Sequence, residues 1–202
     1  MNSRTAMREL AAAGALLASY PLDLIARRGE PLLNSQHSEP VVLAHGLGGS
    51  RANLLALATY LRIAGFGNIS YFEYPRWQPI TDSAAELGGM VRALADEHGG
   101  AHLIGHSLGG TIARHYASGA PRGEVRSLIT LGSPYWFSQW SPDEVAVFGD
   151  EDPIVPPPPE HVANGNAFGK MVVLRSTGHL ALLYHPEVLR IAGTELRARR
   201  AK

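Results

Sequence analysis

The sequence contains no cysteine, which excludes disulfides, thiolate nucleophiles and cysteine-ligated metals and leaves the redox compartment open. It also lacks a charge excess, because 18 Lys and Arg residues balance 18 Asp and Glu residues. A nucleic-acid binder needs a basic surface to neutralise phosphates, so no nucleic-acid partner is expected. Charged residues make up only 18% of the chain, which indicates a surface more apolar than average.

The apolar run near the start, Leu10 to Leu17, is far shorter than the about 20 residues that cross a bilayer. With Arg4 and Arg8 before it, the run has the broad shape of a secretory signal. Glu9 and the lack of a clear cleavage site favour a helix lying on the domain or on a membrane surface. A cytoplasmic or membrane-associated location is thus favoured over secretion, with peripheral membrane contact through this helix, and a signal peptide remains the alternative.

From Pro40 onward, short apolar runs alternate with longer helix-like segments. This alternation, with short connections, predicts an α/β fold: a three-layer α/β/α sandwich with a mainly parallel sheet. We expect residues 1–39 to be an N-terminal helical segment and residues 40–202 to be one domain. The predicted strands are 41–44, 69–74, 102–104, 125–131, 145–148 and 171–175, and the predicted helices are 50–64, 83–98, 108–117 and 186–198. In such sheets ligands bind at the carboxyl ends of the strands, where the motifs below fall.

The segment from Gly105 to Gly110 reads GHSLGG and lies between a predicted strand and a predicted helix. Its core is the pattern G-x-S-x-G, with Ser107 in the middle. A serine at such a turn adopts a strained backbone conformation that projects its hydroxyl, and the glycines let neighbouring chain pass close by. We therefore predict that Ser107 is a nucleophile; the alternative is a structural turn serine.

A second motif, HGLGGS at residues 45–50, follows the first predicted strand. The tetrahedral intermediates of acyl transfer carry an oxyanion that needs two backbone donors. One is expected from Leu108, directly after the nucleophile, and the other from this loop. We assign the second to Leu47, because its flanking glycines let its amide turn inward. His45 and His106 are interpreted as packing or loop-anchoring residues.

The loops after the last two predicted strands supply an acid and a base. The first reads GDEDPIVP and offers Asp150, Glu151 and Asp152. A carboxylate must hold the catalytic histidine's tautomer, and Asp152 is favoured because a proline and two apolar residues fix it, with Asp150 next. The second loop presents His179 after a glycine, and we predict that His179 is the base. His185 precedes Pro186 at a helix start and is interpreted as a structural or capping residue.

HGLGGS, GHSLGG, LGSP (131–134), GDEDPIVP and STGHLALLYHPEV (176–188) resemble the small bacterial triacylglycerol lipases and esterases of the α/β-hydrolase superfamily. The resemblance covers about residues 40 to 190. It implies the minimal α/β-hydrolase fold, a carboxylic ester or lipid substrate, the same triad and oxyanion positions, and no cofactor or metal. Larger lipases insert a lid or cap after LGSP. This chain has about a dozen residues there, so we expect a lidless site.

That short insert carries four aromatic residues: Tyr135, Trp136, Phe137 and Trp140. They are predicted to line an acyl groove or contact a lipid surface, or alternatively to pack as core. The expected chemistry is ester hydrolysis through an acyl-enzyme intermediate. An acyltransferase or thioesterase could use the same triad. From another class, the chain could be a non-catalytic module that binds lipid or a partner.

Overall fold

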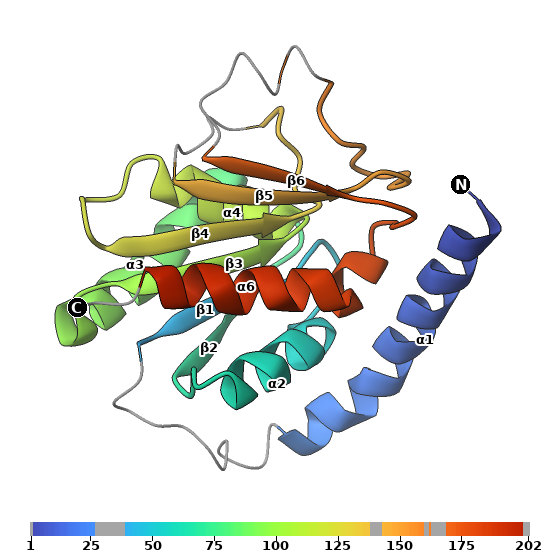
Figure 1. Cartoon of the computed structure of the whole chain (residues 1–202). Coiled ribbons are helices and arrows are strands. Elements are labelled where there is room, and N and C mark those ends of the chain that lie inside the picture. Colours follow the sequence, from blue (N-terminus) through green and yellow to red (C-terminus); the bar gives the residue numbers. More distant parts are fainter. Residues whose placement is uncertain (1, 27–38, 138–142, 160–161, 163–168, 200–202) are drawn as a thin grey trace.

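A computed structural model describes residues 2–26, 39–137, 143–159, 162 and 169–199. Within these residues six strands form one parallel sheet in the order β2-β1-β3-β4-β5-β6 (Figure 1). The strands are β1 (Val41–Ala44), β2 (Ile69–Phe72), β3 (Ala101–His106), β4 (Val125–Leu131), β5 (Glu144–Gly149) and β6 (Lys170–Leu174). Because all strands are parallel, the loops that follow them meet at one edge of the sheet.

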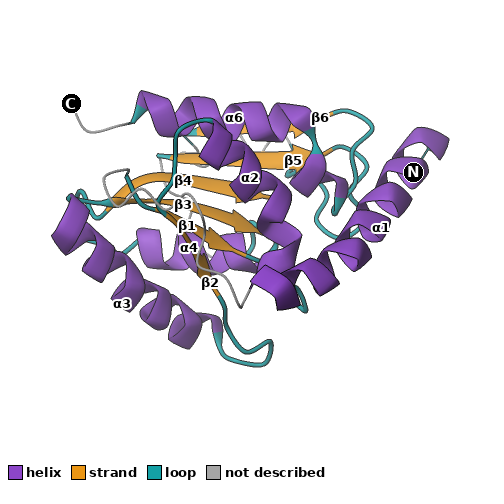
Figure 2. Cartoon of the chain, turned by 90° about the horizontal axis from the view of Figure 1, so that it is seen from below, coloured by secondary structure: helices purple, strands orange, loops and turns teal. Residues whose placement is uncertain are grey.

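Helices cover both faces of the sheet, as Figure 2 shows. One face carries α2 and α6, and the other carries α3 and α4. The predicted three-layer α/β/α sandwich is therefore confirmed. The helices are α1 (Ser3–Ala26), α2 (Leu55–Ile63), α3 (Ile80–His98), α4 (Leu108–Ala117) and α6 (Pro186–Ala198), with short 3₁₀ helices η1 (Arg51–Leu54) and η2 (Ala181–Tyr184).

The four central strands β1, β3, β4 and β5 are buried over most of their length, which is why they are mainly apolar, whereas the edge strand β6 is partly exposed. Alternate residues of β1 enter different cores: Val41 and Leu43 pack beneath α2 and α6, and Val42 and Ala44 pack beneath α3 and α4. A salt bridge also lies inside this core. Arg114 of α4 binds Glu144 of β5 with both side chains fully buried, and it donates to the carbonyl of Pro134 at 2.7 Å. That contact fixes the start of the loop after β4.

Every predicted strand and helix is present, but several have other bounds than predicted. The strands expected at 69–74, 102–104, 145–148 and 171–175 are observed at Ile69–Phe72, Ala101–His106, Glu144–Gly149 and Lys170–Leu174. Residues 125–131, 108–117 and 186–198 form a strand and two helices as expected. The predicted helix 50–64 is divided into η1 and α2, with Ser50 and Asn53 forming a capping box around η1. The predicted helix 83–98 begins three residues earlier, at Ile80, directly after Pro79.

The N-terminal helix α1 is longer than the apolar run that predicted it. It lies along the side of the molecule where the strands end and packs against η1 and η2 (Figure 1). None of the helices in the described residues is long and apolar enough to cross a membrane. The division of the chain at residues 39 and 40 stays a prediction.

Candidate active site

Ser107 stands at the junction of β3 and α4 with a φ of 52°, a left-handed backbone conformation that is unusual for a residue other than glycine. Its amide donates to the carbonyl of Leu131 at 2.8 Å, which fixes the turn to the end of β4. The side chain is only half-buried. These are the features of a serine whose hydroxyl is held at the edge of the sheet.

The glycines around Ser107 permit this turn by their lack of side chains. A Cβ on Gly105 would lie 2.4 Å from the backbone nitrogen of Gly110. A Cβ on Gly109 would lie 2.3 Å from the carbonyl oxygen of His45. The first contact packs α4 against β3, and the second packs α4 against the loop after β1. The close approach inferred from the sequence is therefore present at both glycines.

His179 and Asp152 form a buried pair. His179 Nδ1 lies 2.7 Å from Asp152 Oδ2, and both residues are 4% exposed. The other carboxylate oxygen, Oδ1, accepts the backbone amides of Ile154 and Val155, each at 2.8 Å. Two amides therefore fix the carboxylate, and the carboxylate favours the tautomer with its proton on Nδ1. His179 Nε2 is then left as a proton acceptor.

The other two acidic residues of this loop have different partners. Asp150 is exposed and accepts the amide of Thr177 at 3.3 Å. Glu151 accepts hydrogen bonds from Asn2, the residue directly before α1. Of the three predicted candidates, the structure brings Asp152 to the histidine.

Gly132, directly after β4, is a residue of this site that the sequence analysis missed. Its φ is 53°, and a Cβ there would lie 3.2 Å from both Asp152 Oδ2 and His179 Nδ1. A side chain at this position would press on the paired side chains of His179 and Asp152. The motif LGSP contains this glycine, but the motif gives no indication that Gly132 lies next to Asp152 and His179, which follow 20 and 47 positions later.

The two predicted oxyanion donors belong to segments that adjoin Ser107: Leu108 is the next residue, and Leu47 follows Gly46, which lies close to Ser107. Leu108 begins α4, so its amide has no acceptor within the helix. Leu47 lies in the turn closed by the hydrogen bond from Gly49 to Gly46, and its side chain is 65% exposed. A Cβ on Gly46 would approach Ser107 Cβ to 3.0 Å, which shows how closely this loop packs on Ser107.

His45 and His106 make packing contacts. The His45 ring stacks on Tyr74 at 4.7 Å. The His106 ring lies 4.7 Å from the His179 ring, and its Nε2 lies 3.2 Å from the His179 carbonyl oxygen. Burial, with a smaller contribution from His179, lowers the pKa of His106 to about 3. A neutral His106 therefore joins the turn at Ser107 to the loop of His179.

A second feature that the sequence analysis missed is the contact of α1 with the His179 loop. The Glu9 carboxylate accepts the amides of Leu180 at 3.1 Å and Ala181 at 2.7 Å. Arg8 donates to the carbonyl of Ser176 at 2.8 Å. We call Asn2, Arg8 and Glu9 the α1 clamp, because they hold the loops of His179 and Asp152 from outside.

The aromatic residues after β4 divide into packed and exposed ones. Tyr135 packs edge-on against the buried Phe148, which fits the core alternative. Trp136 and Phe137 are 52% and 59% exposed. Trp140 lies outside the described residues. The described part of the chain contains no cap domain over the site, and none of its His, Asp and Glu side chains form a group of three suited to a metal ion.

Comparison with known proteins gives a family match and a curated relative. The family described as palmitoyl protein thioesterase matches residues 40–139, just under half of the chain. A Pantoea ananatis protein named as a carbamate hydrolase, RutD, is 34% identical over 102 residues, 46% of this chain. The chain spans only 36% of that relative's length.

Solved structures share the fold at low identity. A bacterial membrane phospholipase A has a TM-score of 0.67 and 15% identity, with 96% of each chain covered. A serine hydrolase without lid from Xanthomonas campestris has a TM-score of 0.60 and 18% identity, with 86% of this chain and 87% of that chain covered. The sheet order and the structural neighbours thus show that this chain has the α/β-hydrolase fold, and over about half of its length it is similar to a thioesterase family and to a protein named as a carbamate hydrolase.

Proposed function

We propose that this chain is a carboxylic ester hydrolase with Ser107 as nucleophile, His179 as base and Asp152 as the orienting acid. The observation that carries the proposal is the buried 2.7 Å contact between His179 and Asp152, at the same sheet edge as the left-handed turn of Ser107. A strained turn and a buried polar pair both cost stability, and such costs concentrate at functional sites.

The proposed reaction proceeds in two halves. His179 Nε2 takes the proton of the Ser107 hydroxyl while Ser107 Oγ attacks the ester carbonyl carbon. The amides of Leu47 and Leu108 bind the resulting oxyanion, and each such donor is worth about 3–4 kcal/mol. The bond to the alcohol breaks as His179 returns the proton to the leaving oxygen. Water then attacks the acyl-enzyme with His179 again as base, which releases the acid and restores Ser107.

Burst kinetics with p-nitrophenyl esters of increasing chain length test this function. We expect a burst of p-nitrophenol of one equivalent per chain. Ser107→Ala should abolish the burst and lower kcat on the order of a millionfold, as in enzymes with the same triad. A Ser107→Ala variant that retained the burst would refute the proposal, and so would a wild-type chain that hydrolysed none of the esters.

A thioesterase is the second candidate, and the match to the palmitoyl protein thioesterase family over residues 40–139 favours it. The same triad can attack a thioester, so matched oxygen esters and thioesters of one acyl chain discriminate the two. An added alcohol then tests acyl transfer: an acyltransferase would form a new ester in preference to the free acid. A higher kcat/KM on thioesters than on the matched oxygen esters would identify the chain as a thioesterase instead of an ester hydrolase.

We further propose that the site is lidless and that the exposed Trp136 and Phe137 contact the acyl chain or a lipid surface. The rate of hydrolysis should then rise smoothly through the solubility limit of the substrate. An abrupt jump in rate when substrate micelles form would contradict a lidless site.

A further inference from the structure

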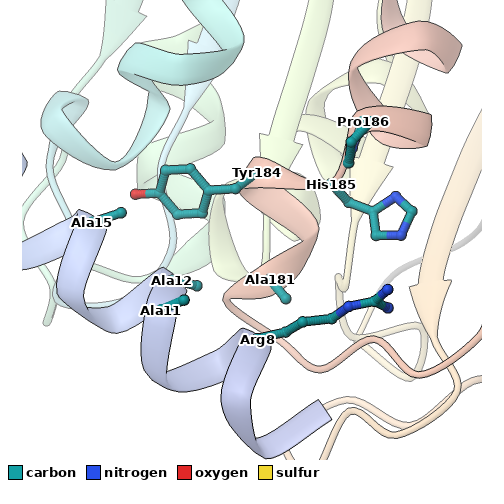
Figure 3. Close-up of a pocket in the computed structure, with 8 residues that line it drawn as sticks. All are labelled: Arg8, Ala11, Ala12, Ala15, Ala181, Tyr184, His185 and Pro186. Atoms are coloured by element: carbon teal, nitrogen blue, oxygen red, sulfur yellow. The ribbon is translucent and has the colours of Figure 1, made fainter. Parts of the chain in front are cut away.

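A cavity of about 370 Å³ lies between α1 and the stretch of chain from η2 to the start of α6 (Figure 3). Its volume is within the range of small-molecule pockets. None of Ser107, Asp152 and His179 lines it. The walls are mainly small apolar side chains: Ala11, Ala12, Ala15, Ala181 and Pro186. Such walls favour an aliphatic chain and provide no partners for a strongly hydrated molecule.

Three polar side chains, those of Arg8, His185 and Tyr184, line this cavity in two separate places. Figure 3 shows the Arg8 guanidinium and the His185 ring facing each other at one end. The Tyr184 side chain extends toward Ala15, and its buried hydroxyl has no hydrogen-bond partner among the described residues. The cavity therefore combines an apolar wall with a cationic end.

The cationic end has no counter-ion within the described residues. Arg8 donates Nη1 to backbone carbonyls of residues 175 and 176 and pairs with no described carboxylate. His185 accepts the amide of Glu187 on Nδ1, so its Nε2 carries the proton and can donate. Burial and the nearby Arg8 lower the pKa of His185. Glu187, the nearest acid along the chain, is paired with Arg190.

We propose that this cavity binds a free fatty acid, with its carboxylate on Arg8 and His185 and its alkyl chain along the alanines of α1. The guanidinium supplies the charge-assisted hydrogen bonds that a carboxylate prefers. The choice of occupant rests on the proposed function, because ester hydrolysis releases this acid. The site is separate from the nucleophile, and its lining residue Ala181 lies two positions after His179.

Binding of decanoate to the Ser107→Ala variant tests the site by isothermal titration calorimetry below the micelle concentration. Arg8→Gln should weaken binding at least tenfold, and Arg4→Gln, on an exposed part of the same helix, should leave it unchanged. Decanol, which has the chain without the charge, should bind more weakly than decanoate. Equal affinities of the Arg8→Gln and Arg4→Gln variants for decanoate would overturn the proposal.

A second pair of variants locates the alkyl chain. Ala15→Phe places a ring in the cavity and should abolish decanoate binding, whereas Ala18→Phe places the same ring on α1 outside the lining residues and should not. Retained binding in Ala15→Phe would show that the acid occupies another place. Because Ser107→Ala has no nucleophile, these measurements do not depend on turnover. If the wild-type chain showed no burst but decanoate still bound through Arg8, the proposed ester hydrolase would be refuted and the fatty-acid site would stand.

Discussion

Two regions hold the candidate active site in different ways: the turn of Ser107 between β3 and α4, and the α1 clamp. The turn is held by backbone, since Gly105 and Gly109 let main chains approach within the distance that a Cβ would occupy. The α1 clamp is held by side chains. Its central contact, Glu9 with Leu180, joins residues 171 positions apart.

The two regions should differ in how well they tolerate substitutions. Backbone contacts in a close-packed interior leave no room for adjustment, so a small change at the turn should be felt by the whole site. Side-chain contacts at a half-buried helix can be weakened stepwise. The turn should therefore set whether the site forms, and the α1 clamp should set how precisely His179 is placed.

The largest effect is expected from Gly109→Ala. Its Cβ would lie 2.3 Å from the carbonyl oxygen of His45, so the loop that carries Leu47 must move. A displacement of about 1 Å in a catalytic site costs about a hundredfold in rate, and we expect at least this loss in kcat/KM. Steady-state kinetics on p-nitrophenyl esters measure it.

Gly89→Ala is the matched control for this prediction. Gly89 lies within α3, and a Cβ there meets no atom within 4 Å. The substitution should raise the free energy of unfolding by about 0.5–1 kcal/mol and leave kcat/KM unchanged. If Gly109→Ala were as active as Gly89→Ala, the turn would not hold the site as we describe.

A smaller effect is expected from Glu9→Gln in the α1 clamp. The substitution keeps the length of the side chain but removes its charge and one of the two acceptor oxygens that bind the amides after His179. Hydrogen bonds to a charged group are worth about 1.5–3 kcal/mol. We expect kcat to fall about tenfold with KM unchanged, because the proposed base, His179, would act in the transition state.

Arg4→Gln, an exposed substitution on the same helix, should leave kcat unchanged. Urea unfolding of both variants distinguishes positioning from stability. A Glu9→Gln chain that unfolds more readily but retains the wild-type kcat would mean that the α1 clamp only stabilises the fold.

The smallest effect concerns His106, which joins the turn of Ser107 to the loop of His179 that the α1 clamp holds. Its pKa is about 3 in the folded chain and about 6.5 in the unfolded chain. Below pH 6.5 the unfolded chain binds the extra proton, so stability falls as the pH falls, by up to about 1.4 kcal/mol per pH unit from this group. In His106→Asn this part of the slope between pH 6.5 and 5 should disappear, and in His115→Asn it should remain. Equal slopes of His106→Asn and the wild type in urea unfolding would contradict the assignment.

The sequence predicted the fold and the short-range parts of the site, because local patterns encode them. Strand and helix periodicity gave the order of the layers, and the glycines around Ser107 indicated a turn that needs close approach. The α1 clamp and Gly132 could not be predicted in this way. Their contacts arise only when distant segments meet at the sheet edge, and a glutamate before an apolar run has the same local appearance whether or not it binds amides.

The most direct test of the central claim is the mapping of a fluorophosphonate adduct by peptide mass spectrometry. If His179 and Asp152 activate the hydroxyl at the turn, one phosphonyl group per chain should be found on Ser107, and His179→Ala should slow its formation at least a thousandfold. An unmodified Ser107 peptide after prolonged exposure, or equal labelling rates in the wild type and His179→Ala, would contradict this account.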